Sequence, residues 1–496
     1  MKRYVQRYLA LALCALIIAA SVLSCGDSGK TDPSVTTAAD NDQLTEAGEE
    51  VTTQLKPDLP EQDFGGYSFR VLTKGAFNTH WTSRDIYAAE ATGDPINDAV
   101  YERNMRVMEK YNFSVVEDPS QSDPAGAAKK VILAGEDAYD MFTMGISANA
   151  SLFTEGMLID FKDLAYIDLD QPWYDHNCRD SLSIAKKVFV MTGDLVIMDK
   201  DATWSIMFNK NFATTLNLPD LYAQVNEGKW TMDLMYSCMA NASADINGDG
   251  AHDYDDSWGL AGEAWNNGAL IAGAGLRVFS KDDDDMPYIS MNTERYYQTF
   301  EIASKINGDK DKSLLSNNVK GFADVWEDCF HKAFKEDRLL FYFTGLNRCT
   351  LLRSMETDFG ILPVPKYDEA QTGYYNLISL WSANGFSVPK TVTDLERTSI
   401  IIEALSAESM YTLTPAYYEI TLKTKLSRDE ESSAMLDIIF SSRIYELGIM
   451  FGWGGLFDLP ASLVGKDSTA IASSVEKRIT STEKAIQKDL DKILAL

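Results

Sequence analysis

Strand-like and helix-like segments alternate through the first part of this sequence, and that order restricts the fold more than any other feature. Residues 67–72 alternate apolar and polar side chains, and 113–116 and 140–144 are two further strand-like runs. Between them, 94–111 and 125–133 carry apolar residues at helical spacing. Such alternation is typical of a parallel sheet covered by helices, so we expect an α/β protein.

The same order predicts where a ligand would bind. Parallel α/β sheets bind ligands in the crevice beyond the carboxyl ends of their strands. The segments that follow the first and third expected strands are 74–84 and 145–150. We expect these two loops to border the site.

Composition fits a large globular protein and argues against a nucleic-acid partner. With 496 residues, of which 45% are hydrophobic and 24% charged, the chain is long enough for two or three domains. Its formal net charge of −29 repels phosphate. Four cysteines beyond residue 25 allow three full pairings, and the sequence does not choose between them: Cys178, Cys238, Cys329 and Cys349.

The amino terminus predicts export and a lipid anchor. Basic residues precede the apolar run 9–23, which is too short for a stable membrane-spanning helix of roughly 20 residues. Ser24 before Cys25 resembles the lipobox of bacterial lipoproteins, whose cysteine carries fatty acyl chains such as palmitate. The resemblance implies a signal peptide at 1–24 and a lipidated flexible tether at 25–61, on the extracytoplasmic face of the cell membrane. An ordinary secreted protein with an incidental Cys25 is the alternative.

One acidic loop has the spacing of a calcium site. Oxygen ligands at loop positions 1, 3, 5, 7, 9 and 12, with Gly250 at position 6 for the tight turn, suit a hard cation. We expect a structural calcium ion, and the alternative is a solvated acidic turn. The expected ligands are Asp245, Asn247, Asp249, the carbonyl of Ala251, Asp253 and Asp256.

Motifs of nucleophilic, zinc-dependent and phosphate-binding enzymes are missing. The sequence has no Gly-x-Ser-x-Gly elbow, no His-Glu-x-x-His pair, no Cys-x-x-Cys and no phosphate loop. We therefore expect a protein that is not an enzyme. Its 74 acidic residues leave a carboxylate pair for glycoside hydrolysis open, so a surface-anchored carbohydrate hydrolase is the alternative function.

Aromatic residues favour a carbohydrate ligand. Several of the nine tryptophans stand beside Asp, Asn, Arg or Gly in expected loops or strand ends. A sugar ring has an apolar C–H face that an aromatic ring can cover, and hydroxyl groups that carboxylates, amides and guanidinium groups can bind. For any single tryptophan, packing in the core is the competing interpretation.

Several segments, taken in order, resemble one known family. They are 171–175, 193–210, 227–233 and 359–366, and the match extends over roughly 63–448. The sequence resembles bacterial extracellular solute-binding proteins of the sugar-binding type, which are related to maltose-binding protein. The resemblance implies a two-lobed type II periplasmic-binding-protein fold with three crossings between the lobes, near 197–204, 343–347 and 380–384. It also implies a monomer that delivers its ligand to the permease of an ABC importer.

The resemblance further implies lobe boundaries and a mechanism. We expect lobe one at 62–200 plus 347–381 and lobe two at 201–346 plus 382–496. The lobes would close on an intact ligand, because contacts to both lobes form only in the closed state. From loop position and residue type, the expected ligand-binding residues are Trp81, Arg84, Asp85, Trp173, Asp175, Trp204, Glu263, Trp265 and Trp381. A sensory or scaffold protein with the same fold is a third possibility.

Overall fold

The computed structural model describes residues 54–75, 81–119, 123–352, 355, 358–422 and 430–496. The expected signal peptide, Cys25 and most of the expected tether lie outside these residues. Lys56–Leu496 form one compact unit. Among the described helices, none combines the length and the apolar character needed to cross a membrane.

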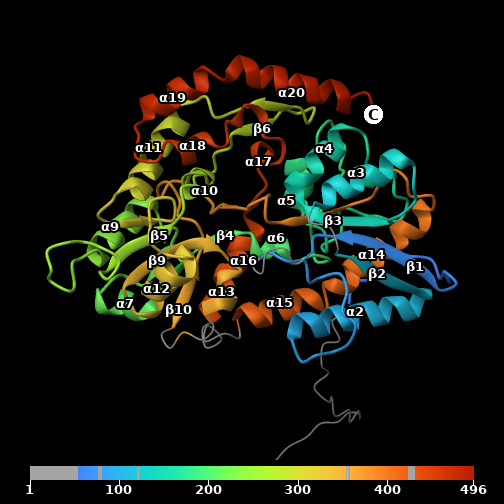
Figure 1. Cartoon of the computed structure of the whole chain (residues 1–496), viewed down its shortest axis with the longest axis horizontal. Coiled ribbons are helices and arrows are strands. Elements are labelled where there is room, and N and C mark those ends of the chain that lie inside the picture. Colours follow the sequence, from blue (N-terminus) through green and yellow to red (C-terminus); the bar gives the residue numbers. More distant parts are fainter. Residues whose placement is uncertain (1–53, 76–80, 120–122, 353–354, 356–357, 423–429) are drawn as a thin grey trace, which may run out of the picture. The chain divides into compact units, whose positions relative to one another are not determined.

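A four-stranded sheet in the order β12-β3-β1-β2 forms the first lobe (Figure 1). β1 (Tyr67–Thr73) pairs in parallel with both β2 (Phe113–Asp118) and β3 (Met141–Gly145). β12 (Asn384–Ser387) runs antiparallel to β3. The three strands expected from the alternating pattern are confirmed, and they share one sheet.

Helices α2 (Pro95–Tyr111) and α3 (Pro124–Ala134) connect these parallel strands. Each begins after an aspartate whose carboxylate accepts main-chain N–H groups of the first turn, and each has proline at its start. Two helices from much later in the chain, α14 (Leu395–Ser409) and α15 (Leu413–Leu422), pack against α2.

A five-stranded sheet in the order β10-β4-β9-β5-β8 forms the second lobe. β5 (Trp258–Gly262) runs parallel to β8 (Ser313–Leu315) and β9 (Leu339–Gly345). β4 (Trp204–Asn209) runs antiparallel to both β9 and β10 (Phe359–Leu362). Every residue of these five strands is buried, which explains why the sequence shows continuous apolar runs here rather than alternation.

The other elements surround the sheets or join them. The helices are α4 (Ala150–Thr154), α5 (His176–Leu182), α6 (Met198–Asp201), α7 (Lys210–Thr215), α8 (Leu221–Asn226), α9 (Met232–Ala242), α10 (Asn266–Gly273), α11 (Glu294–Gly308), α12 (Lys332–Lys335), α13 (Arg348–Leu351), α16 (Glu430–Ser441), α17 (Leu447–Phe451), α18 (Leu459–Ser462), α19 (Ser468–Glu476) and α20 (Ile479–Ile493). Short strands β6 (Phe279–Lys281) and β7 (Pro287–Ile289) form one pair, and β11 (Asn376–Leu377) and β13 (Arg443–Ile444) another. Helical turns of other types are η1 (Ile146–Asn149), η2 (Phe161–Asp163), η3 (Trp326–His331) and η6 (Trp453–Gly455).

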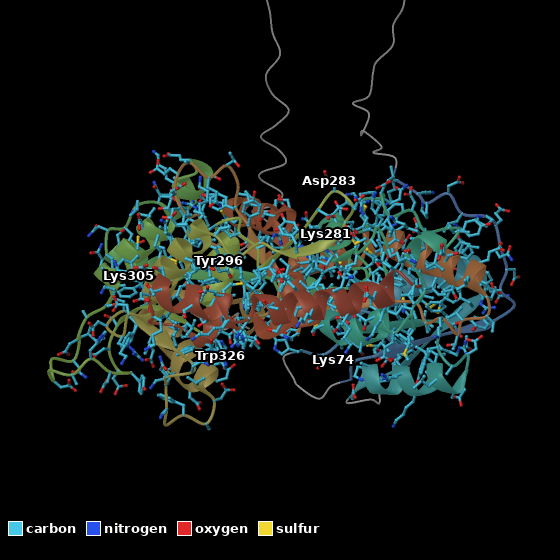
Figure 2. The ribbon with its side chains drawn as sticks, turned by 90° about the horizontal axis from the view of Figure 1, so that it is seen from above. Lys74, Lys281, Asp283, Tyr296, Lys305 and Trp326 are labelled. Carbon is cyan, nitrogen blue, oxygen red and sulfur yellow. The ribbon has the colours of Figure 1, made fainter. Side chains whose placement is uncertain are left out.

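The carboxyl-terminal helices connect the two lobes. α19 packs on α11 of the second lobe, and α20 contacts both β7 and α4, the latter a helix of the first lobe. Figures 1 and 2 show these helices, in red, running along one face of the molecule.

Two of the expected lobe boundaries are wrong. β10 lies within 347–381, which we expected in lobe one, but its hydrogen bonds go to β4 of the second sheet. β12 lies within 382–496, which we expected in lobe two, but it pairs with β3 of the first sheet. The chain also does not leave the second sheet at 343–347, because β9 and β10 both belong to that sheet.

The chain passes from the first sheet to the second through α6. Met191 pairs with Phe386 of β12, and Trp204 begins β4. It returns between β10 and β12. Later in the chain, α15 packs on α2 of the first lobe and α16 packs on β10 of the second lobe.

The four cysteines left open by the sequence are free thiols and are buried: Cys178, Cys238, Cys329 and Cys349.

Candidate functional site

In each sheet, the parallel strands have their carboxyl ends at one common edge. In the first sheet, β1 and β3 end at Thr73 and Gly145, and in the second sheet β5 and β9 end at Gly262 and Gly345. Ligands of parallel α/β sheets bind beyond such carboxyl ends. Figure 1 shows α6, which carries the chain from one sheet to the other, near β3 and β4. These two edges therefore define the candidate site.

An aromatic cluster joins the two edges. The ring of Trp381 lies 4.9 Å from that of Trp265 and 5.8 Å from that of Phe457, and the Trp265 and Phe457 rings stack at 6.2 Å. The main-chain oxygen of Trp381 is 3.3 Å from the position that a Cβ atom on Gly145 would take. Trp381 thus contacts the end of β3 in the first lobe while its ring packs on the second lobe. Trp381 is 39% exposed, so part of its surface remains open to a ligand.

Two more of the expected tryptophans lie at the end of β9. Trp204 opposes Gly345 in the β4–β9 pairing, and it is almost completely buried. The half-buried ring of Trp81 comes within 3.4 Å of the position of a Cβ atom on Gly345. A side chain at Gly345 would also meet the main-chain oxygen of Asp201 at 2.9 Å, so glycine permits this close approach. Trp81 extends from the loop after β1 and so links the two lobes.

Glu263 supplies a carboxyl group that the protein itself does not use. It follows β5 directly and is half-buried, and no described residue donates a hydrogen bond to its carboxylate. Burial raises the pKa of Glu263 to about 7, and nearby Arg348 opposes that shift. Near neutral pH this group can both donate and accept hydrogen bonds, as sugar hydroxyls require.

Further polar atoms, one in the middle of β9 and three in the segments that follow β5 and β9, are buried without a hydrogen-bond partner among the described residues. They are Tyr342 Oη, Asn347 Oδ1, Asn266 Nδ2 and Arg348 Nη1, of which Arg348 Nη1 lies 3.8 Å from Glu327 Oε1 in an ion pair. Burial also raises the pKa of Tyr342, so its hydroxyl stays protonated. Buried polar groups in native proteins are normally satisfied by protein, water or ligand, so these atoms mark a polar region that something else completes.

Two cationic side chains border the site from the first lobe. Lys74 directly follows β1 and is labelled in Figure 2; burial lowers its pKa, and no described residue forms an ion pair with it. Arg84 has a 41% exposed side chain, and its Nη2 lies 3.4 Å from Asp201 Oδ2. Both come from the first loop that the sequence nominated.

Three expected ligand-binding residues belong instead to the protein's frame. Trp173 is completely buried in the core of the first lobe. Asp85 is also completely buried and accepts hydrogen bonds from the main-chain N–H of Ile197 at 2.8 Å and from Ser83 Oγ at 2.7 Å. Asp175 accepts the first main-chain N–H groups of α5. These side chains are occupied within the protein, so they support the site without contacting a ligand.

A buried ionic network explains the role of Asp175. Arg443 donates to Asp175 at 2.5 Å and to Asp199 of α6 at 2.9 Å, and all three side chains are at most 8% exposed. Tyr445 Oη donates to the same Asp175 carboxylate at 2.6 Å. These ion pairs connect α6, which leads from the first sheet to the second, with β13 and with the start of α5. Neighbouring carboxylates hold the pKa of the Arg443 guanidinium above its usual range despite burial.

Sequence reasoning missed Phe457, Asn347 and Arg348. The last two directly follow a strand of the second sheet, so the rule that ligands bind beyond carboxyl ends could have found them had β9 been included. No local signal distinguishes Phe457 from an ordinary core residue.

The expected calcium ligands lie in the loop between α9 and β5. Asp245 accepts the N–H groups of Gly248 and Gly250 at 2.7 and 3.0 Å, and Asp256 accepts those of Ile246 and Asp253 at 3.0 and 2.8 Å. The N–H groups of Asp253 and Ile246 lower the pKa of Asp256. Within the described ranges, no three His, Cys, Asp or Glu side chains converge as metal ligands. Calcium binding stays a prediction.

Comparison with known proteins places the fold. No protein-family model and no curated protein matches the sequence. Among solved structures, the sugar-binding protein MalE from Xanthomonas citri superimposes with a TM-score of 0.58 at 12% identity, covering 84% of this chain and 98% of that one. UgpB from Mycobacterium tuberculosis, in complex with glycerophosphocholine, gives 0.55 at 14% identity over 85% and 99%. A solute-binding protein of an ABC transporter from Thermotoga lettingae, bound with α-D-tagatose, gives 0.51 at 11% identity over 85% and 100%.

The superpositions include nearly the whole length of each of these neighbours and 84–85% of this chain. The expected fold is confirmed: this chain has the two-lobed α/β fold of the solute-binding proteins.

Proposed function

We propose that this protein is the substrate-binding component of an ABC importer and that it captures a carbohydrate between its two lobes. The observation that carries the proposal is the aromatic cluster of Trp265, Trp381 and Phe457, which joins the carboxyl-end edges of the two sheets. Glu263 and three of the buried polar atoms follow β5 and β9 at the same edge of the second sheet.

The arrangement suits binding by hinge closure. Trp381 lies in the return passage between β10 and β12 and touches both lobes. A sugar ring stacked on its open face would gain hydrogen bonds from the Glu263 carboxyl on the second lobe and from Arg84 on the first. Those contacts form together only when the lobes are close, so the ligand stabilises the closed state by its differential affinity.

Structural neighbours support the ligand class. The proteins that share this fold include ones described as bound to maltotriose, maltotetraose, tagatose and glycerophosphocholine. The first three of these ligands are sugars rich in hydroxyl groups, whereas glycerophosphocholine has two hydroxyl groups beside a charged phosphodiester. Aromatic stacking with an adjustable carboxyl group is the chemistry that a sugar needs.

Export and anchoring complete the proposal. The lipobox-like Ser24-Cys25 pair supports a lipid on Cys25, with the folded body held on the outer face of the cell membrane by the polar segment that follows. The permease of the importer would be the partner that receives the ligand. Calcium in the 245–256 loop would stiffen the second lobe, since no catalytic group accompanies the loop.

Titration of intrinsic fluorescence with a panel of neutral oligosaccharides, followed by mass spectrometry of each sugar, tests the function. We expect one sugar to give a saturable change and to be recovered intact. Trp381→Ala should weaken its binding by about two- to tenfold, because stacked aromatic contacts contribute about 0.5–1.5 kcal/mol. Trp453→Phe is the control, because that tryptophan is buried and its ring packs on Phe279 and Phe451. Shortened sugar products would overturn the proposal in favour of a hydrolase.

A further inference from the structure

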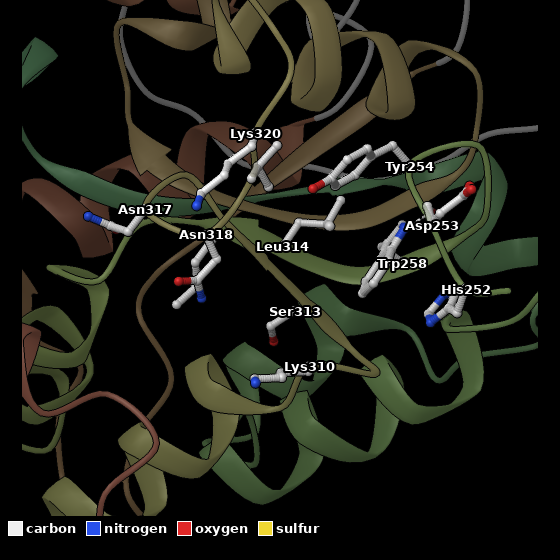
Figure 3. A pocket seen from close by; sticks show the side chains of 12 residues that line it. His252, Asp253, Tyr254, Trp258, Lys310, Ser313, Leu314, Asn317, Asn318 and Lys320 are labelled. Atoms are coloured by element: carbon white, nitrogen blue, oxygen red, sulfur yellow. Dashed lines mark hydrogen bonds between the residues drawn. The ribbon is translucent and has the colours of Figure 1, made fainter.

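A second cavity opens on the second lobe, beside the edge strand β8. Its volume is about 570 Å³, and residues from the 252–258 segment, from β8 and from the segments on either side of β8 line it (Figure 3). None of the candidate ligand-binding residues between the lobes lines this cavity. It is a separate feature from the site between the lobes.

One wall of the cavity is aromatic and rigid. His252 stacks on Trp258 with ring centroids 3.9 Å apart and an angle of 12°. Hydrogen bonds fix both rings: Trp258 Nε1 donates to the Asp253 carbonyl at 2.8 Å, and His252 Nε2 lies 3.0 Å from the Ser257 carbonyl. Because both side chains are held before any ligand arrives, binding against this wall costs little side-chain entropy.

Tyr254 extends the same wall. Its ring packs edge-on against Phe322 at 5.2 Å. Arg338 donates to the main-chain oxygens of Tyr254 and Asp256 at 2.9 and 3.0 Å, which holds the segment in place. The wall therefore offers ring surface together with a phenolic hydroxyl.

Two lysines also line the cavity, one at each end of it in Figure 3. Lys310 precedes β8 and Lys320 follows it, and both side chains line the cavity (Figure 3). Neither lysine forms an ion pair with any described residue, whereas Lys312 between them pairs with Asp309 at 2.8 Å. Asp253 is the one acidic residue in the lining, and its carboxylate accepts the N–H of Asp255.

This charge is unusual for the chain as a whole. The sequence carries 74 acidic against 45 basic residues, so a lysine has many possible partners on the surface. Two ammonium groups that form no ion pair line the same cavity as the stacked rings and the amides of Asn317 and Asn318. This set of groups matches a ligand that carries both a ring face and a negative charge.

We propose that this cavity is a second carbohydrate-binding site and that it takes an acidic sugar. The pyranose ring of a uronic acid would lie against His252 and Tyr254, and its carboxylate would bind between Lys310 and Lys320. Asn317 and Asn318 would bind the ring hydroxyls. This proposal goes beyond the proposed transport function and does not depend on it.

The cavity is linked to the site between the lobes through the main chain. Asn317 Oδ1 accepts the N–H of Ala264 at 2.8 Å, and Ser316 N–H donates to the Gly262 carbonyl at 2.9 Å. Glu263 lies between those two contacts. A sugar held in the cavity would therefore contact Asn317, which is hydrogen-bonded to the segment that carries Glu263.

Isothermal titration of the detergent-solubilised full chain with trigalacturonic acid tests the inference. We expect saturable binding that weakens about tenfold in a Lys310→Ala/Lys320→Ala double variant, since each exposed ion pair contributes up to about 1 kcal/mol. Binding should also weaken as salt concentration rises. The matched control is Lys484→Ala/Lys488→Ala, which removes the same charge from exposed positions on α20 and should leave the affinity unchanged.

Four results would overturn the proposal. The first is the absence of heat at millimolar trigalacturonic acid. The second is equal binding of neutral maltotriose at the cavity, and the third is equal binding of inorganic phosphate, which would indicate a simple anion site. The fourth is loss of trigalacturonic acid binding in Trp381→Ala with full binding in the lysine double variant, which would place the acidic sugar between the lobes and leave the transport function intact.

Discussion

Glu263 gives the sharpest prediction, because removing its charge should stabilise the protein and weaken its binding at the same time. Its pKa of about 7 in the folded protein compares with an ordinary value of 4.5. Between these pH values the folded state holds a proton that the unfolded state has lost, so stability falls as pH rises from 4.5 to 7.

The size of the effect follows from that difference. At 1.36 kcal/mol for each pKa unit, the buried charge would cost about 3 kcal/mol above pH 7. The carboxyl group is half-buried, and partial contact with water reduces the expected cost to about 1–2 kcal/mol. Glu263→Gln keeps the shape and cannot ionise. It should therefore unfold at higher urea than the parent at pH 8 and at the same urea concentration at pH 4.

Urea denaturation at pH 4 and pH 8, paired with sugar titration at pH 8, is the assay. Glu403→Gln is a matched control: its pKa is also about 7, because of burial, but its carboxylate accepts a hydrogen bond from Tyr174 Oη at 2.5 Å. That variant should not change sugar binding. The reasoning about Glu263 is refuted if Glu263→Gln lowers stability at pH 8, which would reveal an internal partner, or if it leaves sugar affinity unchanged.

Three further experiments test the buried ionic network, the expected calcium loop and the burial of the cysteines. Arg443→Met should destabilise the protein by about 3–5 kcal/mol in urea, because Asp175 and Asp199 would lose their buried counter-charge; a loss below 1 kcal/mol would contradict that. Calcium added after chelation should raise the melting temperature of the parent but not of Asp245→Asn, and an equal rise in both would exclude the 245–256 loop as its site. The four buried thiols should react with a thiol reagent only after unfolding, and fast reaction of the native protein would disprove their burial.

The alternation of strands and helices in the sequence correctly predicted the first three parallel strands. It did not predict which lobe contains β10 and β12. Residues 67–144 contain strands and helices that pair with their neighbours in sequence, so their order predicts their sheet. β10 and β12 are both short, buried strands. The residues of β10 and β12 do not indicate that β10 pairs with β4 and β12 with β3. Those pairings depend on contacts between segments far apart in the chain.

The same limit applies to the site residues. Trp265 and Trp381 could be selected as aromatic residues near strand ends, and the structure brings their rings together. Asp85 and Asp175 were selected by the same features, a polar residue type and a position in an expected loop. Asp85 accepts a hydrogen bond from Ile197 N–H, and Asp175 pairs with Arg443. Both partners lie more than one hundred residues away, and nothing in the sequence indicates these contacts.

Closure of two lobes on an intact sugar is the central claim, and a distance measurement tests it most directly. Spin labels at Lys130→Cys on α3 and Lys332→Cys on α12 would report the separation of the lobes, since both positions are exposed and the native thiols beyond residue 25 are buried. With the sugar identified by fluorescence, we predict a shorter distance at saturation and recovery of uncleaved sugar. An unchanged distance at full saturation would contradict the account.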